Sequence, residues 1–420
     1  MYYKKLLLTI GWLILASTSN AQDTLRINLA QTDSLFIHNN LMLMSKALHI
    51  NAAKALIKQA KLWDNPSVTA EFNLYNANKD KYFDAGRNGE KIFTVDQLIV
   101  LAGKRNKRIA LAKANATYTE FEFYDLMRTL KLEIRNNFYT IYYNNNTVEK
   151  YNEQLKFLST IIDALEFQSA KGNISLKEVL RLKAEYYQLN NDRTELINQI
   201  FDAQENLKTL LNTTAYLKPI VLEENLQNYN TVKINDNAKL INQALNNRSD
   251  LKMVESLAKQ NELNYQLQKR LSIPDLHLGA IYDQAGSYIN NYTGVTLGID
   301  LPVLNRNQGN IKYAKAMADA SMLELKNKNL AITNEVLAAI HKLEQVEQEF
   351  KKVDQSFGAN FKLINDGFVA NYQKRNISLI EFIDFFDAYN QSILQLNRLN
   401  EKRIRTYEEL NYITGEELFK

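Results

Sequence analysis

Side chains able to ligate a metal or to act in catalysis are few in this sequence and lie far apart. The chain has four histidines, His38, His49, His277 and His341, and no cysteine. Two methionines lie close to the first two histidines, but a single Met or His on an amphipathic helix is usually a core or surface residue. The sequence also lacks a nucleophile elbow, an HExxH pair and a phosphate-binding glycine loop. We therefore predict no enzymatic activity, no cofactor and no metal ligands.

A repeated octet carries the most specific pattern of polar residues. Residues 172–179 read GNISLKEV, and residues 375–382 read RNISLIEF. In each copy a serine is followed three residues later by a glutamate, which is the pattern of a helix capping box. Because the period is near half the chain, it indicates a duplicated unit rather than a solenoid of short repeats. Each octet is predicted to be a tight turn between two helices.

Long stretches without helix breakers surround both octets. Residues 104–171 contain no proline or glycine, and a continuous helix of this span is about 100 Å long at ~1.5 Å per residue. Further helices are predicted over 31–62, 176–212, 311–366 and 379–414. Within the first stretch, apolar residues recur at heptad spacing: Ile134, Ile141, Val148, Leu155 and Ile162, with Tyr151, Leu158 and Leu165 at the companion position.

Two regions alternate apolar and polar residues and predict β-hairpins. The first covers residues 66–101, with a polar loop over 76–90, and the second covers residues 274–302. Each strand is predicted to have one apolar and one polar side. The apolar set includes Phe72, Val95, Leu278 and Leu297, and the polar set includes Thr69, Glu71, Thr296 and Asp300.

The N-terminus reads as a secretory signal over residues 1–21, with Lys4 and Lys5 before an apolar run and small residues at the cleavage site. Glycine (13) and proline (4) are scarce, which favours long helices over a loop-rich enzyme. The formal net charge of +4 offers no concentrated basic face for nucleic acid. The predicted organisation is a signal peptide (1–21), a first repeat (22–212), a linker (213–236) and a second repeat (237–420).

Four amphipathic strands in one chain cannot close a barrel. No stretch after the signal is apolar enough to cross a membrane as a helix, so a membrane role would require β-strands. An open sheet in lipid would leave costly unpaired edges. Closure must then come from other copies, and three copies would supply about twelve strands, an even number within the known range.

This order of elements resembles the TolC-like outer-membrane efflux proteins over essentially the whole mature chain. Residues 98–105 and 302–311 resemble the branch that serves heavy-metal pumps of the CusC and CzcC type. The resemblance implies an α+β fold in which duplicated long α-helical hairpins form a periplasmic coiled-coil tunnel. It also implies that the four antiparallel β-strands of each chain contribute to the twelve-stranded outer-membrane β-barrel of a homotrimer. The apolar strand faces would contact lipid and the polar faces would line the lumen.

The resemblance also assigns roles to the two turns. In this family, acidic side chains just past the second turn line a constricted tip, and an aromatic residue helps to hold the tunnel shut. The implied pore constriction consists of Glu381, Asp384, Glu178 and Tyr372, and the implied turns that dock an adaptor or pump contain Gly172, Asn173, Ser175, Arg375, Asn376 and Ser378. Three copies of each carboxylate around one axis would attract cations. Simple helix capping by the two glutamates, and a solvated face for Asp384, remain open alternatives. Arg375 could pair with a carboxylate such as Glu178.

The expected function is therefore a passive exit duct in the outer membrane with a periplasmic helical extension. An inner-membrane pump of the RND type would deliver substrates, with metal cations expected, through a periplasmic membrane-fusion adaptor. The expected contacts are two further copies of the chain, the adaptor, the pump and outer-membrane lipid, with no nucleic acid. A drug-efflux or type I secretion conduit is an alternative that differs only in its partner. A periplasmic coiled-coil adaptor is another, but it would not need four amphipathic strands.

Overall fold

The computed structural model describes residues 24–77, 79–84, 86, 89–221, 236–286, 289–353, 367–368, 370–372, 374 and 376–419. The predicted signal peptide, most of the predicted linker and Arg375 lie outside these residues. The chain divides into two compact units, one formed by residues 1–44, 127–247 and 334–420 and the other by 45–126 and 248–333. Each unit takes elements from both predicted repeats, so the compact units and the sequence repeats are different divisions of the chain.

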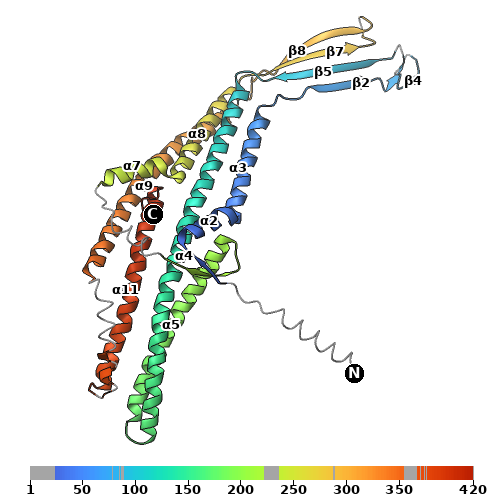
Figure 1. Cartoon of the computed structure of the whole chain (residues 1–420). Coiled ribbons are helices and arrows are strands. Elements are labelled where there is room, and N and C mark those ends of the chain that lie inside the picture. Colours follow the sequence, from blue (N-terminus) through green and yellow to red (C-terminus); the bar gives the residue numbers. More distant parts are fainter. Residues whose placement is uncertain are drawn as a thin grey trace, which may run out of the picture. The chain divides into compact units, whose positions relative to one another are not determined.

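The second unit contains a four-stranded antiparallel sheet in the order β2-β5-β7-β8 (Figure 1). Its strands are β2 (Ser67–Phe72), β5 (Lys91–Ile99), β7 (Leu276–Asp283) and β8 (Tyr292–Ile299). The two predicted hairpins join because β5 pairs with β7 along eight residues, from Ile92 opposite Asp283 to Ile99 opposite Leu276. The region predicted as a polar loop over 76–90 is more ordered than expected, because β3 (Tyr75–Asn76) pairs with β4 (Lys81–Tyr82). Strands of two residues are too short to show an alternating pattern.

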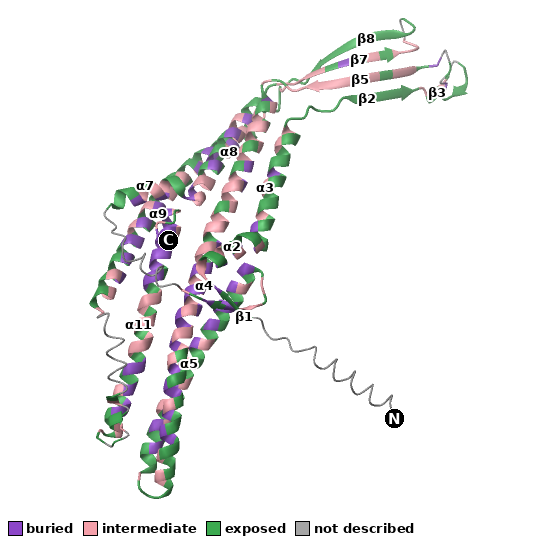
Figure 2. Cartoon of the chain, in the orientation of Figure 1, coloured by how far each residue is buried: buried purple, intermediate pink, exposed green. Residues whose placement is uncertain are grey.

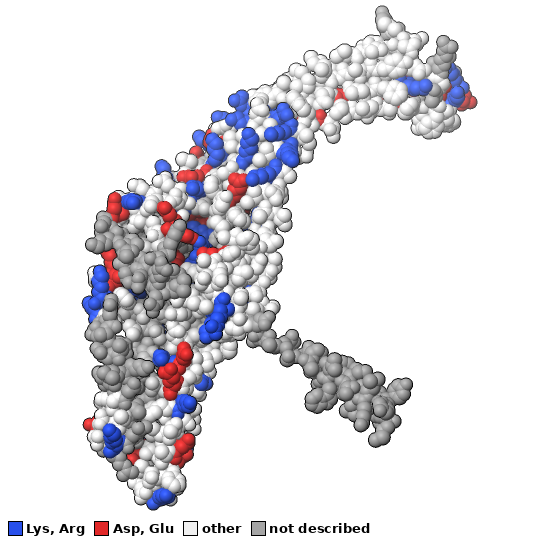
Figure 3. Space-filling view, viewed as in Figure 1, with Lys and Arg blue, Asp and Glu red and all other residues white. Residues whose placement is uncertain are grey.

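The strand register places the predicted apolar residues on one face. Val95 lies opposite Val68 on one side and Ala280 on the other, and Leu278 lies opposite Leu297. The apolar side chains of this face are exposed, with Val68 at 70% and Val295, opposite Ala280, at 79%. Figure 3 shows few charged side chains over the strands. The opposite face carries Thr69, Glu71, Asp96, His277 and Thr296. Both predicted faces are therefore present in the sheet.

The same unit contains most of α3 (Leu41–Ala60), the first part of α4 (Lys104–Ala170), α8 (Ser249–Leu271) and the first part of α9 (Gln308–Lys352). The single helix predicted over 31–62 is wrong, since α2 (Leu29–Asn39) and α3 are separated at Asn40. The Asn40 side chain accepts a bond from the Leu43 amide (2.9 Å) and donates one to the Leu210 carbonyl (2.8 Å). A buried asparagine that caps the next helix competes with helix continuation.

The first unit contains β1 (Thr24–Ile27), α2, most of α4, α5 (Leu176–Leu211), β6 (Tyr216–Pro219), α7 (Asn237–Asn247), the end of α9 and α11 (Leu379–Thr414). Strand β1 pairs in parallel with β6, a four-residue pairing that the sequence analysis missed and that places a strand inside the predicted linker. The long helices over 104–171 and 379–414 are confirmed as α4 and α11. Helix α9 ends at Lys352, and residues 354–366 lie outside the described part of the chain.

The core of this unit follows the predicted heptads. Ile134, Ile141, Tyr151 and Leu158 of α4 are fully buried, and one apolar cluster joins residues of α4, α5 and α11. Figure 2 shows buried residues running along these helices. None of the helices in the described ranges combines the length and the apolar character that crossing a membrane would require.

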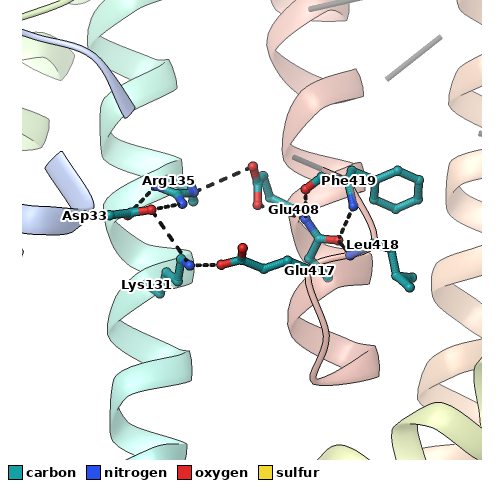
Figure 4. Close-up of polar contacts among 8 residues, drawn as sticks. Asp33, Lys131, Arg135, Glu408, Glu417, Leu418 and Phe419 are labelled. Carbon is teal, nitrogen blue, oxygen red and sulfur yellow. Dashed lines mark hydrogen bonds and ion pairs between the residues drawn. The ribbon is translucent and has the colours of Figure 1, made fainter. Parts of the chain in front are cut away.

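A polar cluster joins α2, α4 and the end of α11 (Figure 4). The Arg135 guanidinium donates to the Asp33 carboxylate, with an Nη1–Oδ1 distance of 2.6 Å, and its Nε lies 3.7 Å from Glu408 Oε1. Lys131 forms ion pairs with Asp33 (3.8 Å) and Glu417. Asn411 then accepts bonds from the amides of residues 418 (2.8 Å) and 419 (3.1 Å). The residues after α11 are thereby fixed to the helical unit.

Candidate functional site

The first predicted turn is a Schellman motif that ends α4. The Asn173 amide donates to the Gln168 carbonyl (3.0 Å), and the Gly172 amide donates to the Ser169 carbonyl (2.9 Å). Gly172 has φ +75°, a left-handed conformation that glycine adopts without a Cβ penalty. The Asn173 side chain also donates to Gln168 Oε1 (2.8 Å). The glycine of the first octet is therefore required by the turn itself.

The second turn contains the counterpart of the longer of these backbone bonds. The Asn376 amide donates to the carbonyl of Asn371, five residues earlier, at 2.9 Å. Its side chain donates to the Asn371 side-chain oxygen at 3.1 Å. Asn376 thus corresponds to Asn173 in structure as well as in sequence. The expected pairing of Arg375 with Glu178 lies outside the described residues and stays a prediction.

The two helices that leave these turns are capped differently. Ser378 and Glu381 form a complete capping box, since the Glu381 carboxylate accepts from the Ser378 amide and hydroxyl, both at 2.8 Å, and the Glu381 amide donates to the hydroxyl (3.2 Å). These bonds hold the pKa of the Glu381 carboxyl below its usual range. Ser175 makes no side-chain cap bond, so the capping box predicted at Ser175 and Glu178 is wrong. The pattern of a serine followed by a glutamate permits the box but does not enforce the rotamers that close it.

Aromatic side chains pack just beyond the second turn. The Tyr372 ring stacks on Phe382 with centroids 4.6 Å apart and an interplanar angle of 20°. Phe382, which is fully buried on α11, also contacts Phe157 of α4 (6.0 Å, edge-on) and Phe386 (5.7 Å). Offset-stacked and edge-on pairs of this kind contribute beyond simple burial. Tyr372 is therefore held by an aromatic group that connects α11 to α4.

The predicted carboxylates of the two turns differ in their surroundings. Glu178 is exposed on α5 and lies close enough to Tyr372 to act on it electrostatically, since burial and the Glu178 charge both raise the pKa of the Tyr372 hydroxyl. Asp384 is exposed on α11, whereas Glu381 is bound to Ser378. The structure thus brings Glu178 and Tyr372 together and places Glu381 in a cap.

Three further acids extend this group and were missed by the sequence analysis. Burial, followed by the charges of Asp387 and Asp192, raises the pKa of the Glu185 carboxyl. Burial is also the largest cause of the raised pKa of Asp192, to which Asp387 adds. Glu178, Glu185 and Asp192 are spaced seven residues apart on α5, so they share one face of the helix. This heptad spacing was the available signal.

The histidines remain dispersed. His38 bonds to the Ser34 carbonyl (2.8 Å), His341 lies 3.3 Å from Glu344, and His277 lies 2.8 Å from Asp96. Within the described ranges, no group of three or more His, Cys, Asp or Glu side chains is arranged to hold a metal ion.

The sequence matches the family described as outer membrane efflux protein over residues 34–213 and 240–360, which is more than half of the chain. The chain belongs to this outer membrane efflux protein family. No curated protein sequence matched the chain.

Solved structures of outer membrane channels share the fold of this family member. The CmeC outer membrane channel of Campylobacter jejuni has a TM-score of 0.76 and 13% identity, covering 92% of this chain and 85% of its own. CusC has a TM-score of 0.73 and 15% identity, covering 92% of each chain. The outer membrane protein VceC of Vibrio cholerae has a TM-score of 0.74 and 15% identity, covering 92% of this chain and 96% of its own. These similar values support one helix-rich α+β fold and do not select a branch within the family.

The segments that resemble the heavy-metal branch are junctions between strands and helices. At the first, residues 102 and 103 have positive φ, and Lys104 donates to the Ile273 carbonyl (2.6 Å) and pairs with Asp275 (2.8 Å). At the second, Asn307 has φ +58° and its side chain donates to the backbone and side-chain oxygens of Gln268 (2.9 and 2.8 Å). The residues of both segments are therefore explained by the local geometry of the chain.

Proposed function

We propose that this family member is the passive outer-membrane duct of a tripartite efflux system, closed as a homotrimer. The observation that carries the proposal is the four-stranded sheet with one exposed apolar face and one polar face. Among the described strands, β2 and β8 each have a neighbour on one side only. In lipid such edges are tolerated only when they are paired. Three copies would pair them in a barrel of about twelve strands, with Val95 and Leu278 toward lipid and Thr69 and Thr296 toward the lumen.

The helical turns would form the periplasmic end of the duct. We assign Glu178 and Asp384 to a negatively charged constriction, with Glu185, Asp192 and Asp387 extending it along α5 and α11. The first two are supported by their exposure near the turns. The other three are supported by the effect of the Asp387 charge on Glu185 and Asp192. Carboxylates repeated around an axis concentrate cations at a narrow passage. The Glu381 carboxylate would add its negative charge to the constriction while it stays bound to Ser378.

The same turns would dock the partners. The first turn would offer Gly172, Asn173 and Ser175 for contact. The second turn would offer Arg375, Asn376 and Ser378. A periplasmic membrane-fusion adaptor would contact these turns, and an inner-membrane RND-type pump would supply the energy. Metal cations are the proposed substrates, because the constriction would be acidic and would concentrate cations.

Single-channel recording in planar bilayers tests the duct and its constriction. The purified protein is compared with a Glu178→Gln, Asp384→Asn double variant and with Glu255→Gln, which removes an exposed carboxylate from α8. We expect unitary cation-selective currents from the wild type and from E255Q, and a lower cation selectivity in the double variant. A water-soluble monomer would refute the outer-membrane duct. Currents with unchanged selectivity in the double variant would refute the constriction alone.

Growth of a strain that lacks the gene tests the substrate class. Complementation that restores resistance to metal salts but not to organic toxins supports metal efflux. Resistance restored only to organic toxins would overturn the metal assignment and leave the duct in place.

A further inference from the structure

A group of titratable side chains lies on the polar face of the sheet, outside the helical turns. Asp96 belongs to β5, His277 to β7, and Asp300 directly follows β8. Asp96 lies opposite Gly279 of β7. Gly279 follows His277 by two residues on that strand. Asp96 and His277 are therefore diagonal neighbours on one face, a separation that long side chains bridge.

Both ring nitrogens of His277 face carboxylates. Nδ1 lies 2.8 Å from Asp96 Oδ2, and Nε2 lies 3.9 Å from Asp300 Oδ2. Because Asp96 is an acceptor, the contact assigns the Nδ1 proton to the histidine in both of its charge states. The proton that titrates then binds at Nε2, on the side of Asp300. Protonation changes the charge of the group without breaking its short hydrogen bond.

The surroundings keep this group in place. A Cβ on Gly279 would lie 2.3 Å from Thr296 Oγ1, 2.8 Å from the Val95 carbonyl and 3.5 Å from Asp96 Oδ1. A Cβ on Gly298, which lies opposite His277, would lie 3.4 Å from the His277 Cβ. Any larger residue at Gly279 would displace the backbone or the threonine beside the pair. The cluster is therefore built into the sheet.

Solvent reaches the group, since the side chains of Asp96, His277 and Asp300 are 31%, 36% and 95% exposed. Asp275 also acts electrostatically on His277, and its carboxylate is paired with Lys104 at 2.8 Å. With a neutral imidazole the three side chains carry about two negative charges, and with a protonated imidazole about one. Histidine is the side chain that makes this change between about pH 5 and pH 8.

We propose that Asp96, His277 and Asp300 form a proton-controlled charge site that sets how strongly the polar face of the sheet selects for cations. The inference rests on the proposed function, in which this face lines the lumen. Three copies would then place about three additional negative charges at one level of the lumen when the histidines deprotonate. Cation selectivity should rise with pH, independently of the carboxylates at the helical turns.

Reversal potentials under a salt gradient test the proposal, measured at about pH 5 and about pH 8. The variants are His277→Gln, which keeps a side-chain donor for Asp96 but cannot titrate, and Asp300→Asn, which removes an almost fully exposed carboxylate. His341→Gln is the matched control, because His341 also lies beside a carboxylate, Glu344, but on α9. We expect the ratio of cation to anion permeability to rise at least twofold with pH in the wild type and in H341Q. The rise with pH should be clearly smaller in H277Q than in the wild type, and the ratio should be lower at high pH in D300N.

The outcomes separate this inference from the proposed function. Channel currents whose selectivity titrates equally in the wild type and H277Q would overturn the charge site and leave the duct intact. Selectivity that does not change with pH in the wild type would also overturn the charge site and leave the duct intact. A reconstituted trimer that carries no current, or a soluble monomer, would overturn the duct and this inference together.

Discussion

Replacement of Phe382 by alanine should loosen the aromatic group beside the second turn. The side chain is fully buried and contacts Tyr372, Phe157 and Phe386. Truncation of a buried phenylalanine costs about 3–5 kcal/mol in lost transfer free energy and cavity formation. The upper half of that range applies here, because each lost aromatic pair adds about 0.5–1.5 kcal/mol to simple burial.

Amide hydrogen exchange measures this loss locally. If exchange reports the opening equilibrium, about 4 kcal/mol corresponds to exchange that is faster by about a thousandfold. We expect this acceleration in peptides from residues 376–389, together with a smaller one in α4 near Phe157. Peptides from β1 and β6 should be unchanged, because that pairing does not involve the aromatic group.

The matched control is Phe201→Ala, which truncates an exposed phenylalanine of α5. Exposed substitutions of this kind usually change stability by less than about 0.5 kcal/mol. Equal protection in F382A and F201A, with both proteins correctly folded, would refute the conclusion that Phe382 joins α11 to α4. In bilayers, F382A should spend more time open than F201A if this packing keeps the constriction shut.

Three further predictions concern the turns and the end of α11. Ser378→Ala should cost about 1 kcal/mol by removing a formed cap, measured as faster exchange at the start of α11, whereas Ser175→Ala should have little effect because it caps nothing. Glu185 has a pKa raised above its ordinary value of 4.5, so its stabilising contribution is complete below that value and is lost as the pH rises through the higher folded pKa. Glu185→Gln should therefore increase protection of α5 at neutral pH and reduce its pH dependence, and unchanged pH dependence would contradict this. Asn411→Ala should cost about 1–3 kcal/mol by leaving the amides of residues 418 and 419 without their acceptor, measured as faster proteolysis after α11.

The elements that could be predicted from the sequence are those with a long repeated signal. The heptads of 104–171 identify the buried side of α4, and strand alternation gives both faces of the sheet, because every residue in those segments adds to the same pattern. The β1–β6 pairing and the break at Asn40 depend on a few residues and on partners far along the chain. Asn40 bonds to Leu210, 170 residues away. No local window contains that partner.

The octets show how far a repeated motif predicts a repeated site. One backbone bond is shared by both turns, since Asn173 and Asn376 each donate to a carbonyl five residues earlier. The carboxylates differ, because Glu381 is held by Ser378 while Glu178 is not held by Ser175 and instead acts on Tyr372. A carboxylate engaged in a cap is fixed in position, and one outside a cap can respond to a cation or to a neighbouring ring. The duplicated glutamates are therefore not equivalent, and Glu178 is the better candidate for a residue whose contacts would change if the proposed constriction opens.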